Sequence, residues 1–133
     1  MAEQLRPSRS VLQWPAPVRK ADGDPLLTVG LAVIGPVVRI DLSGDLDLDT
    51  SPQLAEAVAQ ALIHRPRVAI IDLSAVDFCD CAGLSALLRV ARRVTGESAA
   101  FHLERPSAVV RRLLQLTGTG PVLGLAAAVE VVG

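Results

Sequence analysis

The residues of this chain whose side chains could do chemistry gather in two short stretches. The first is an acidic run in which carboxylates alternate with other residues from 45 to 49, and the second contains Cys79, Asp80 and Cys81. Alternating carboxylates can ligate a cation, and the backbone at a helix N-terminus can stabilise a thiolate or receive a phosphate group. Each of these chemistries competes with a purely structural role for the same residues.

The two cysteines favour structure over redox chemistry. Cys81 is a candidate redox-sensitive residue because a helix N-terminus stabilises a thiolate, but the neighbouring carboxylate of Asp80 favours the neutral thiol. A disulfide to Cys79 across one intervening residue would close a small, strained ring. We therefore expect Cys79 to point into the core as a small apolar residue, with redox sensing by Cys81 as the lesser alternative.

The acidic run superficially follows a calcium-binding loop, with Asp45, Asp47 and Asp49 at alternate positions and Glu56 at the twelfth. Thr50 stands where such a loop needs glycine, and a strand rather than a helix is expected before the run. We therefore expect no metal at this turn, and a solvated turn without function is the alternative to a role in binding.

Neither zinc chemistry nor nucleophilic catalysis finds a complete set of residues. His64 and His102 are the only histidines, and neither is spaced with the cysteines for a zinc site. The sequence also lacks a G-x-S-x-G motif and a glycine-rich phosphate loop. We therefore expect no enzyme activity and no cofactor.

Composition indicates one globular domain that works through binding. Half of the residues are apolar, the mean hydropathy is +0.43, and 13 basic residues nearly balance 14 acidic ones. Balanced charge and 2% aromatic residues offer no basic or stacking platform for nucleic acid. No apolar run approaches the roughly 20 residues that cross a bilayer, and no signal-peptide pattern is present, so we expect a cytoplasmic protein without membrane insertion.

The chain divides by composition into an arm and a domain. Residues 1–25 are rich in proline and charge and are expected to form a flexible arm, and residues 26–133 form the domain. At the other end, residues 126–132 offer at most two turns of helix.

Strands and helices are expected to alternate within the domain, with Gly35 and Pro36 at a hairpin between the first two strands. The apolar run from 68 to 73 is typical of a strand covered on both faces. The predicted strands are 27–33, 38–42, 68–73, 99–103 and 122–125. With short connections, this order predicts an α/β fold with a mixed, mostly parallel sheet of about five strands and three to four helices packed on it.

Three helices are expected from apolar residues at helical spacing. The first begins at Thr50 or Ser51 and ends at Arg65, the second spans 82–94, and the third spans 106–118. The second helix has its apolar stripe on one side and a polar side formed by Ser85, Arg89, Arg92 and Arg93. The short segment 80–83 therefore lies at a helix N-terminus, where unpaired backbone N–H groups point outward.

Three stretches together resemble the STAS domain, the module of anti-sigma factor antagonists and of sulphate-transporter tails. Residues 72–74 (Asp-Leu-Ser) and 80–84 (Asp-Cys-Ala-Gly-Leu) resemble its central signature. We call residues 80–84 the signature loop. Residues 44–47 match the glycine-acid-leucine-aspartate turn before the first helix, and 106–118 match the third helix with its closing threonine and glycine. The matches occur in the family's order, and the resemblance covers roughly residue 26 to the C-terminus.

The resemblance implies a non-enzymatic module that binds an anti-sigma factor of the serine-kinase type and thereby frees a sigma factor for transcription. It implies binding through the acidic turn, the signature loop and the second helix. The implied partner-binding residues are Asp45, Asp47, Asp80, Cys81, Ala82, Gly83, Leu84 and Arg89. The alternative is an accessory subunit of a membrane transporter complex, since stand-alone STAS domains also occur in such assemblies.

The signature loop departs from phosphorylation-switched relatives, which carry a serine or threonine between the signature aspartate and glycine. Here the two positions are Cys81 and Ala82, and neither has a hydroxyl to phosphorylate. Ser85 lies about one turn further along, on the polar side of the helix. We therefore expect that phosphorylation does not switch this chain.

Overall fold

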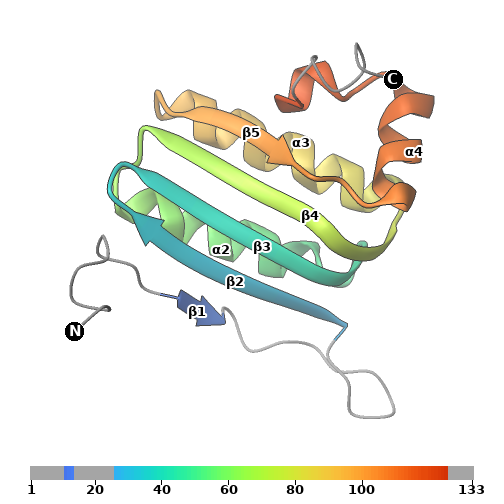
Figure 1. Cartoon of the computed structure of the whole chain (residues 1–133), viewed down its shortest axis with the longest axis horizontal. Helices are drawn as coiled ribbons and strands as arrows, with labels where there is room; N and C mark the ends of the chain where they lie inside the picture. The colour runs from blue at the N-terminus through green and yellow to red at the C-terminus, as the bar shows by residue number, and fades with distance from the viewer. Residues whose placement is uncertain (1–10, 14–25, 126–133) are drawn as a thin grey trace.

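The structure is a computed structural model that describes residues 11–13 and 26–125. Its sheet has the order β1-β2-β3-β4-β5 (Figure 1). The strands are β1 (Val11–Gln13), β2 (Leu27–Ile34), β3 (Val37–Leu46), β4 (Val68–Cys79) and β5 (Ala100–Glu104). The helices are α2 (Ser51–Ile63), α3 (Cys81–Gly96), α4 (Ala108–Thr117) and the 3-10 helix η1 (Pro121–Leu123).

The α/β class is confirmed, but the expectation of a mostly parallel sheet is wrong. β3 pairs in parallel with β4, and β4 with β5, whereas β2 is antiparallel to both β1 and β3. The tight turn at Gly35 and Pro36 forces the β2–β3 pair to be antiparallel, and β1 adds a second such pair at the edge. The sheet is therefore evenly mixed.

The predicted strand at 122–125 is also wrong, because η1 occupies this stretch. The sheet has five strands only because β1 pairs with β2, within the segment expected to be an arm. Gly124 has a positive φ of 74°, and a Cβ there would come within 2.1 Å of the Phe101 carbonyl oxygen. This short segment lies between Gly120 and Gly124. It buries Leu123 by forming a helical turn instead of an extended strand.

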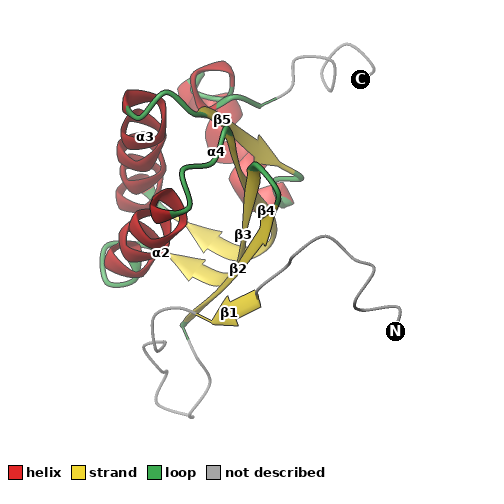
Figure 2. Ribbon diagram, turned by 90° about the vertical axis from the view of Figure 1, so that its left-hand side faces the viewer, coloured by secondary structure: helices red, strands yellow, loops and turns green. Residues whose placement is uncertain are grey.

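Helices α2 and α3 lie side by side on one face of the sheet (Figure 2). β2 and β3 alternate as predicted, so that residues such as Ile40 face these helices. In β4, which was expected to be covered on both faces, Ile71 is fully buried whereas Ile70 is only half-buried. The predicted apolar stripes of both helices complete the core. The second face is only partly covered. α4 packs against β4, but Val68 and Ile70 remain half-buried.

Strands β3 and β4 run further than the sequence predicts, and this extension builds the site. β3 continues to Leu46 and β4 to Cys79, across register shifts between Asp41 and Ser43 and between Gly44 and Asp45. Leu46 therefore pairs directly with Cys79. The acidic turn after β3 and the signature loop after β4 consequently lie next to each other.

The predicted arm lies outside the described residues except for β1, as does the predicted helical tail at 126–132. Among the described residues, none of the helices combines the length and apolar character needed to span a bilayer.

Candidate functional site

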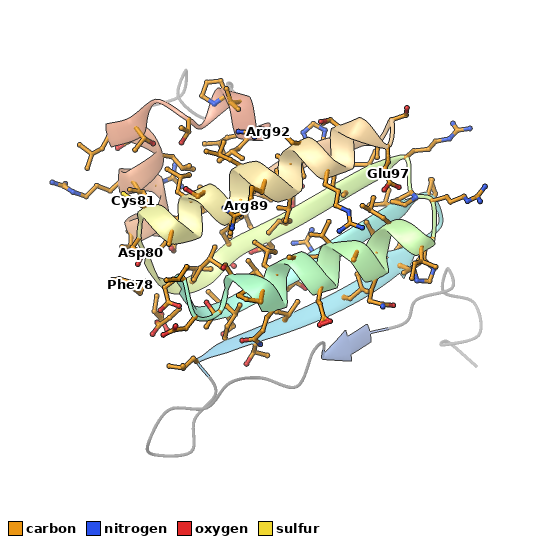
Figure 3. The ribbon with its side chains drawn as sticks, turned by 180° about the vertical axis from the view of Figure 1, so that it is seen from behind. Phe78, Asp80, Cys81, Arg89, Arg92 and Glu97 are labelled. Atoms are coloured by element: carbon orange, nitrogen blue, oxygen red, sulfur yellow. The ribbon has the colours of Figure 1, made fainter. Side chains whose placement is uncertain are left out.

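The signature loop forms a capped N-terminus of α3. Asp80 has an extended backbone (φ −108°, ψ −171°), and its Oδ1 accepts a 2.9 Å hydrogen bond from the backbone N–H of Gly83. This is the geometry of a side-chain N-cap, which satisfies one of the free N–H groups at the helix start. Cys81 is the first residue of α3 and is exposed, and Ala82 is half-buried (Figure 3). The loop therefore presents these two short side chains outward.

Gly83 fastens this loop to the end of β3. A Cβ at residue 83 would lie 2.3 Å from the carbonyl oxygen of Leu46 and 3.0 Å from Sγ of Cys79. Only glycine allows the first turn of α3 to approach the β3 backbone so closely. Gly83 is buried and Leu84 is only 6% exposed, so both residues shape the loop from inside rather than present a surface.

The acidic turn is held by Asp47 and Thr50. Oδ1 of Asp47 accepts hydrogen bonds from the backbone N–H groups of Asp49 (3.0 Å) and Thr50 (3.1 Å). Thr50 occupies the N-cap position of α2, as predicted, but its fully buried hydroxyl donates to the carbonyl of Asp45 instead of capping the helix. Asp47 thus acts as a turn former, in the manner of an Asx turn. No group of three or more His, Cys, Asp or Glu within the described part of the chain could hold a metal ion.

The two cysteines occupy different environments, as the sequence predicts. Cys79 is 7% exposed, and burial, reinforced by the negative charge of Asp80, raises its pKa to about 11. Its thiol therefore remains protonated at neutral pH and behaves as a small apolar group. Cys81 is exposed and free.

The polar side of α3 is confirmed. Ser85, Arg89, Arg92 and Arg93 are all exposed, and Arg89 extends from α3 toward α2 (Figure 3). Arg89 and Cys81 are eight residues apart, which corresponds to about 12 Å along the helix axis. The arginines are therefore separate from the acidic turn but belong to the same side of the molecule.

A second cluster lies on the opposite face of the sheet, around Asp72. This carboxylate is 3% exposed and accepts hydrogen bonds from the Ser74 N–H (2.8 Å), the Ser74 hydroxyl (2.7 Å) and the Arg105 Nε (2.8 Å). Arg39 on β3 also pairs with it, and with Glu104 on β5 (3.0 Å). Asp72 therefore ties three neighbouring strands together and anchors the connection that leads to α4.

The protonation of Asp72 follows from these contacts. Burial opposes the charged form, but the hydrogen bonds from Ser74 and the charge of Arg105 outweigh it and lower the pKa of the carboxyl. Burial works against the charged form of Arg39 as well, yet its bond to Glu104 and the nearby carboxylates raise its pKa. Both shifts favour the charged forms of Asp72 and Arg39 at neutral pH.

The signature loop, the glycine contact and the turn beside them lie in a segment that matches a known protein family. A family model described as "Mlab, STAS domain" matches residues 31–124. The chain belongs to the STAS domain family. This STAS protein is 33% identical over 92 residues to the anti-sigma-F factor antagonist RsfB of Mycobacterium tuberculosis, covering 69% of the chain and 75% of RsfB.

Solved structures give the same assignment. The crystal structure of an anti-sigma factor antagonist from Mycobacterium paratuberculosis matches with a TM-score of 0.64 and 26% identity, covering 83% of this chain and 91% of that one. The unphosphorylated form of the anti-sigma factor antagonist SpoIIAA shares the fold, with a TM-score of 0.62, 24% identity and coverage of 78% and 92%. These relatives are regulatory binding proteins rather than enzymes, which supports the non-enzymatic interpretation.

Two apolar residues near the signature loop of this STAS domain are exposed, and the sequence did not predict a role for them. Phe78 pairs with Asp45 across β3 and β4 and is 46% exposed, and Leu48 in the acidic turn is 72% exposed. Their signal was an apolar side chain next to an aspartate, which is ambiguous until the strand ends are known. Large apolar residues beside a loop of small side chains are typical of protein-binding surfaces.

Proposed function

We propose that this STAS protein binds an anti-sigma factor of the serine-kinase type and thereby frees a sigma factor. The observation that carries the proposal is the capped N-terminus of α3, which exposes Cys81 and half exposes Ala82 beside the acidic turn. The 33% identity to RsfB, an anti-sigma-F factor antagonist, supports the same role. The unit that we propose carries it is the STAS domain at residues 26–133, to which β1 (Val11–Gln13) adds an edge strand.

The docking surface, as we define it, has an acidic edge, a centre of small side chains and a basic helix side. Its members are Asp45, Asp47, Asp80, Cys81, Ala82 and Arg89. Gly83 and Leu84 contribute indirectly, because both are buried and fix the position of the loop. Phe78 and Leu48 add exposed apolar area at the acidic edge.

Substitution at the centre of the docking surface tests the proposal. Ala82→Glu adds a charged side chain at a half-buried position of the loop and should weaken binding of the anti-sigma factor by at least about tenfold. Isothermal titration calorimetry measures the affinity, and Ala100→Glu, at an exposed β5 position away from the loop, is the matched control. If the wild-type chain binds no serine-kinase-type anti-sigma factor but is recovered with a membrane transporter complex, the transporter-subunit alternative replaces this proposal.

We also propose that phosphorylation does not switch this chain. The SpoIIAA structures include an unphosphorylated and a phosphorylated form, so that protein does accept the group. In this chain the two residues between Asp80 and Gly83 are Cys81 and Ala82, a thiol and a methyl group where a hydroxyl is needed, and Ser85 lies about one turn away. A phosphate on residue 81 would meet the free N–H groups of the helix start, so the position itself is suitable.

Incubation with the kinase partner and ATP tests this second point. The wild-type chain should take up no phosphate by mass spectrometry, whereas a hydroxyl introduced at one of the two positions, by Cys81→Ser or by Ala82→Ser, should take up one phosphate group. Cys81→Ser with Ser85→Ala should behave like Cys81→Ser, which identifies the modified position. Phosphate on any residue of the wild-type chain would contradict the proposal.

A further inference from the structure

A groove of about 220 Å³ lies between α2 and α3, on the same side of the molecule as the docking surface. Residues of both helices line it: Ser51, Ala55, Ala86, Arg89, Val90 and Arg93. It begins at the first residue of α2, which directly follows the acidic turn. The groove is therefore continuous with the docking surface.

The two arginines of the groove form no salt bridge with any acidic residue that the structure describes. Arg89 and Arg93 are exposed and four residues apart, so they lie on one side of α3, where two like charges repel each other. The salt bridges found among residues 26–125 involve Arg39 and Arg105, and none involves Arg89 or Arg93. An anion placed between the two guanidinium groups would relieve this repulsion.

The floor of the groove suits a small acidic group. Ala55 and Ala86 have short side chains, and Ala86 and Val90 are only 3% and 5% exposed. The buried Ala86 and Val90 lower the effective dielectric constant beneath a bound carboxylate and offer it no polar group that competes with the arginines. The volume lies below the roughly 300 to 1,000 Å³ of sites that enclose drug-sized ligands, so a single side chain fits better than a nucleotide.

We propose that this groove receives an acidic side chain of the protein partner, which pairs with Arg89 and Arg93. The inference rests on the proposed function, and it adds the chemistry of the partner and its orientation. The acidic edge contains Asp45, Asp47 and Asp80, and the arginine groove lies further along α3. The docking surface is therefore acidic at one end and basic at the other. A partner with an acidic residue over the groove and basic residues over the acidic edge fits in one orientation only.

Adjacent arginines of α3 provide the matched test. Arg93 lines the groove on the α2 side of the exposed surface of α3, whereas Arg92 lies on its η1 side, in a hollow that Val122 also lines (Figure 3). Arg93→Glu and Arg92→Glu change the net charge equally. We expect Arg93→Glu to weaken binding of the anti-sigma factor by roughly 10- to 100-fold and Arg92→Glu by less than about threefold. Equal effects of the two substitutions, or unchanged binding by Arg93→Glu, would overturn the proposal.

A measurement without the partner keeps the groove testable on its own. Titration of the wild-type chain with N-acetylglutamate, followed by NMR of the arginine Nε–Hε signals, should shift Arg89 and Arg93 more than Arg92. Uniform shifts, or tighter binding of inorganic phosphate than of the carboxylate, would overturn the proposal. Selective shifts in a chain that binds no anti-sigma factor would reject the proposed function and leave the groove as a carboxylate site for another protein.

Discussion

Two aspartates of the STAS signature lie eight residues apart and have different structural roles. Asp72 is buried on one face of the sheet, where Ser74, Arg39 and Arg105 donate to it. Asp80 lies just after the C-terminal end of β4, where its side chain accepts one hydrogen bond from the backbone of Gly83 and leaves Cys81 exposed. The signature therefore combines a part that holds the strands in register with a part that displays a loop, and the two can be altered separately.

The largest expected effect is on the Asp72 side. Asp72→Asn removes the charge that two arginines share, so we expect the free energy of unfolding to fall by about 3 kcal/mol, the low end for a buried pair because Arg105 is largely exposed. Urea unfolding measures this loss. Asp41→Asn removes only an exposed contact of Arg39 and should cost less than about 0.5 kcal/mol.

Acid pH tests the same contribution of the Asp72 charge by protonating the carboxylate. Because the pKa of Asp72 is lowered in the folded state, its contribution is complete above the unfolded carboxyl value of about 4 and is lost as the pH falls through the folded value. The gap between wild type and Asp72→Asn should therefore narrow below pH 4. A gap that stays constant down to pH 2 would show that the charge of Asp72 does not cause it.

Alkaline pH tests the interior side of the signature loop. Cys79 has a pKa of about 11 in the folded protein against 9.0 for an ordinary thiol, so its contribution is complete below pH 9 and is lost between pH 9 and 11. We expect a loss of about 2 to 3 kcal/mol of unfolding free energy across that range, measured by urea unfolding under reducing conditions. Cys81→Ala should keep this pH dependence and Cys79→Ala should weaken it.

Gly83 tests whether the loop depends on its contact with β3. Gly83→Ala places a Cβ 2.3 Å from the Leu46 carbonyl oxygen, so the helix start must move, and we expect a loss of about 2 kcal/mol. Gly96→Ala, at the other end of α3, meets nothing within 4 Å and should be neutral or stabilise by up to about 1 kcal/mol. Thermal unfolding of both variants decides the point, and equal values would remove the contact from the explanation.

The smallest effect on stability is expected at Asp80. Asp80→Ala removes the N-cap and should cost about 1 kcal/mol, whereas Asp80→Asn keeps an acceptor for the Gly83 N–H and should cost less. Circular dichroism during denaturation measures both. If anti-sigma factor binding falls in Asp80→Asn while stability does not, the charge of Asp80 acts in docking beyond its role as a cap.

The sequence by itself determined those features that depend on local spacing. Apolar residues at helical spacing placed α2 and α3 within a few residues of their observed ends, and the break between the strand and α3 placed Asp80 and Cys81 at a helix start. Gly35 and Pro36 located the hairpin. These features follow from neighbouring residues, so no knowledge of distant contacts was needed.

The tertiary structure alone decided which distant residues meet. Arg39 reaches Glu104 across 65 residues of sequence and Asp72 across 33, and neither contact has a local signal. The extension of β3 and β4 likewise depended on their pairing, because Ser74 and Asp77 give β4 a polar stretch that alone predicts a loop. The arginine groove exists only because α2 and α3 pack side by side, so that Ala55 and Ala86 line the same hollow. Local sequence fixes which face of an element is apolar, whereas the choice of the neighbour that covers it is made by the packing of the whole chain.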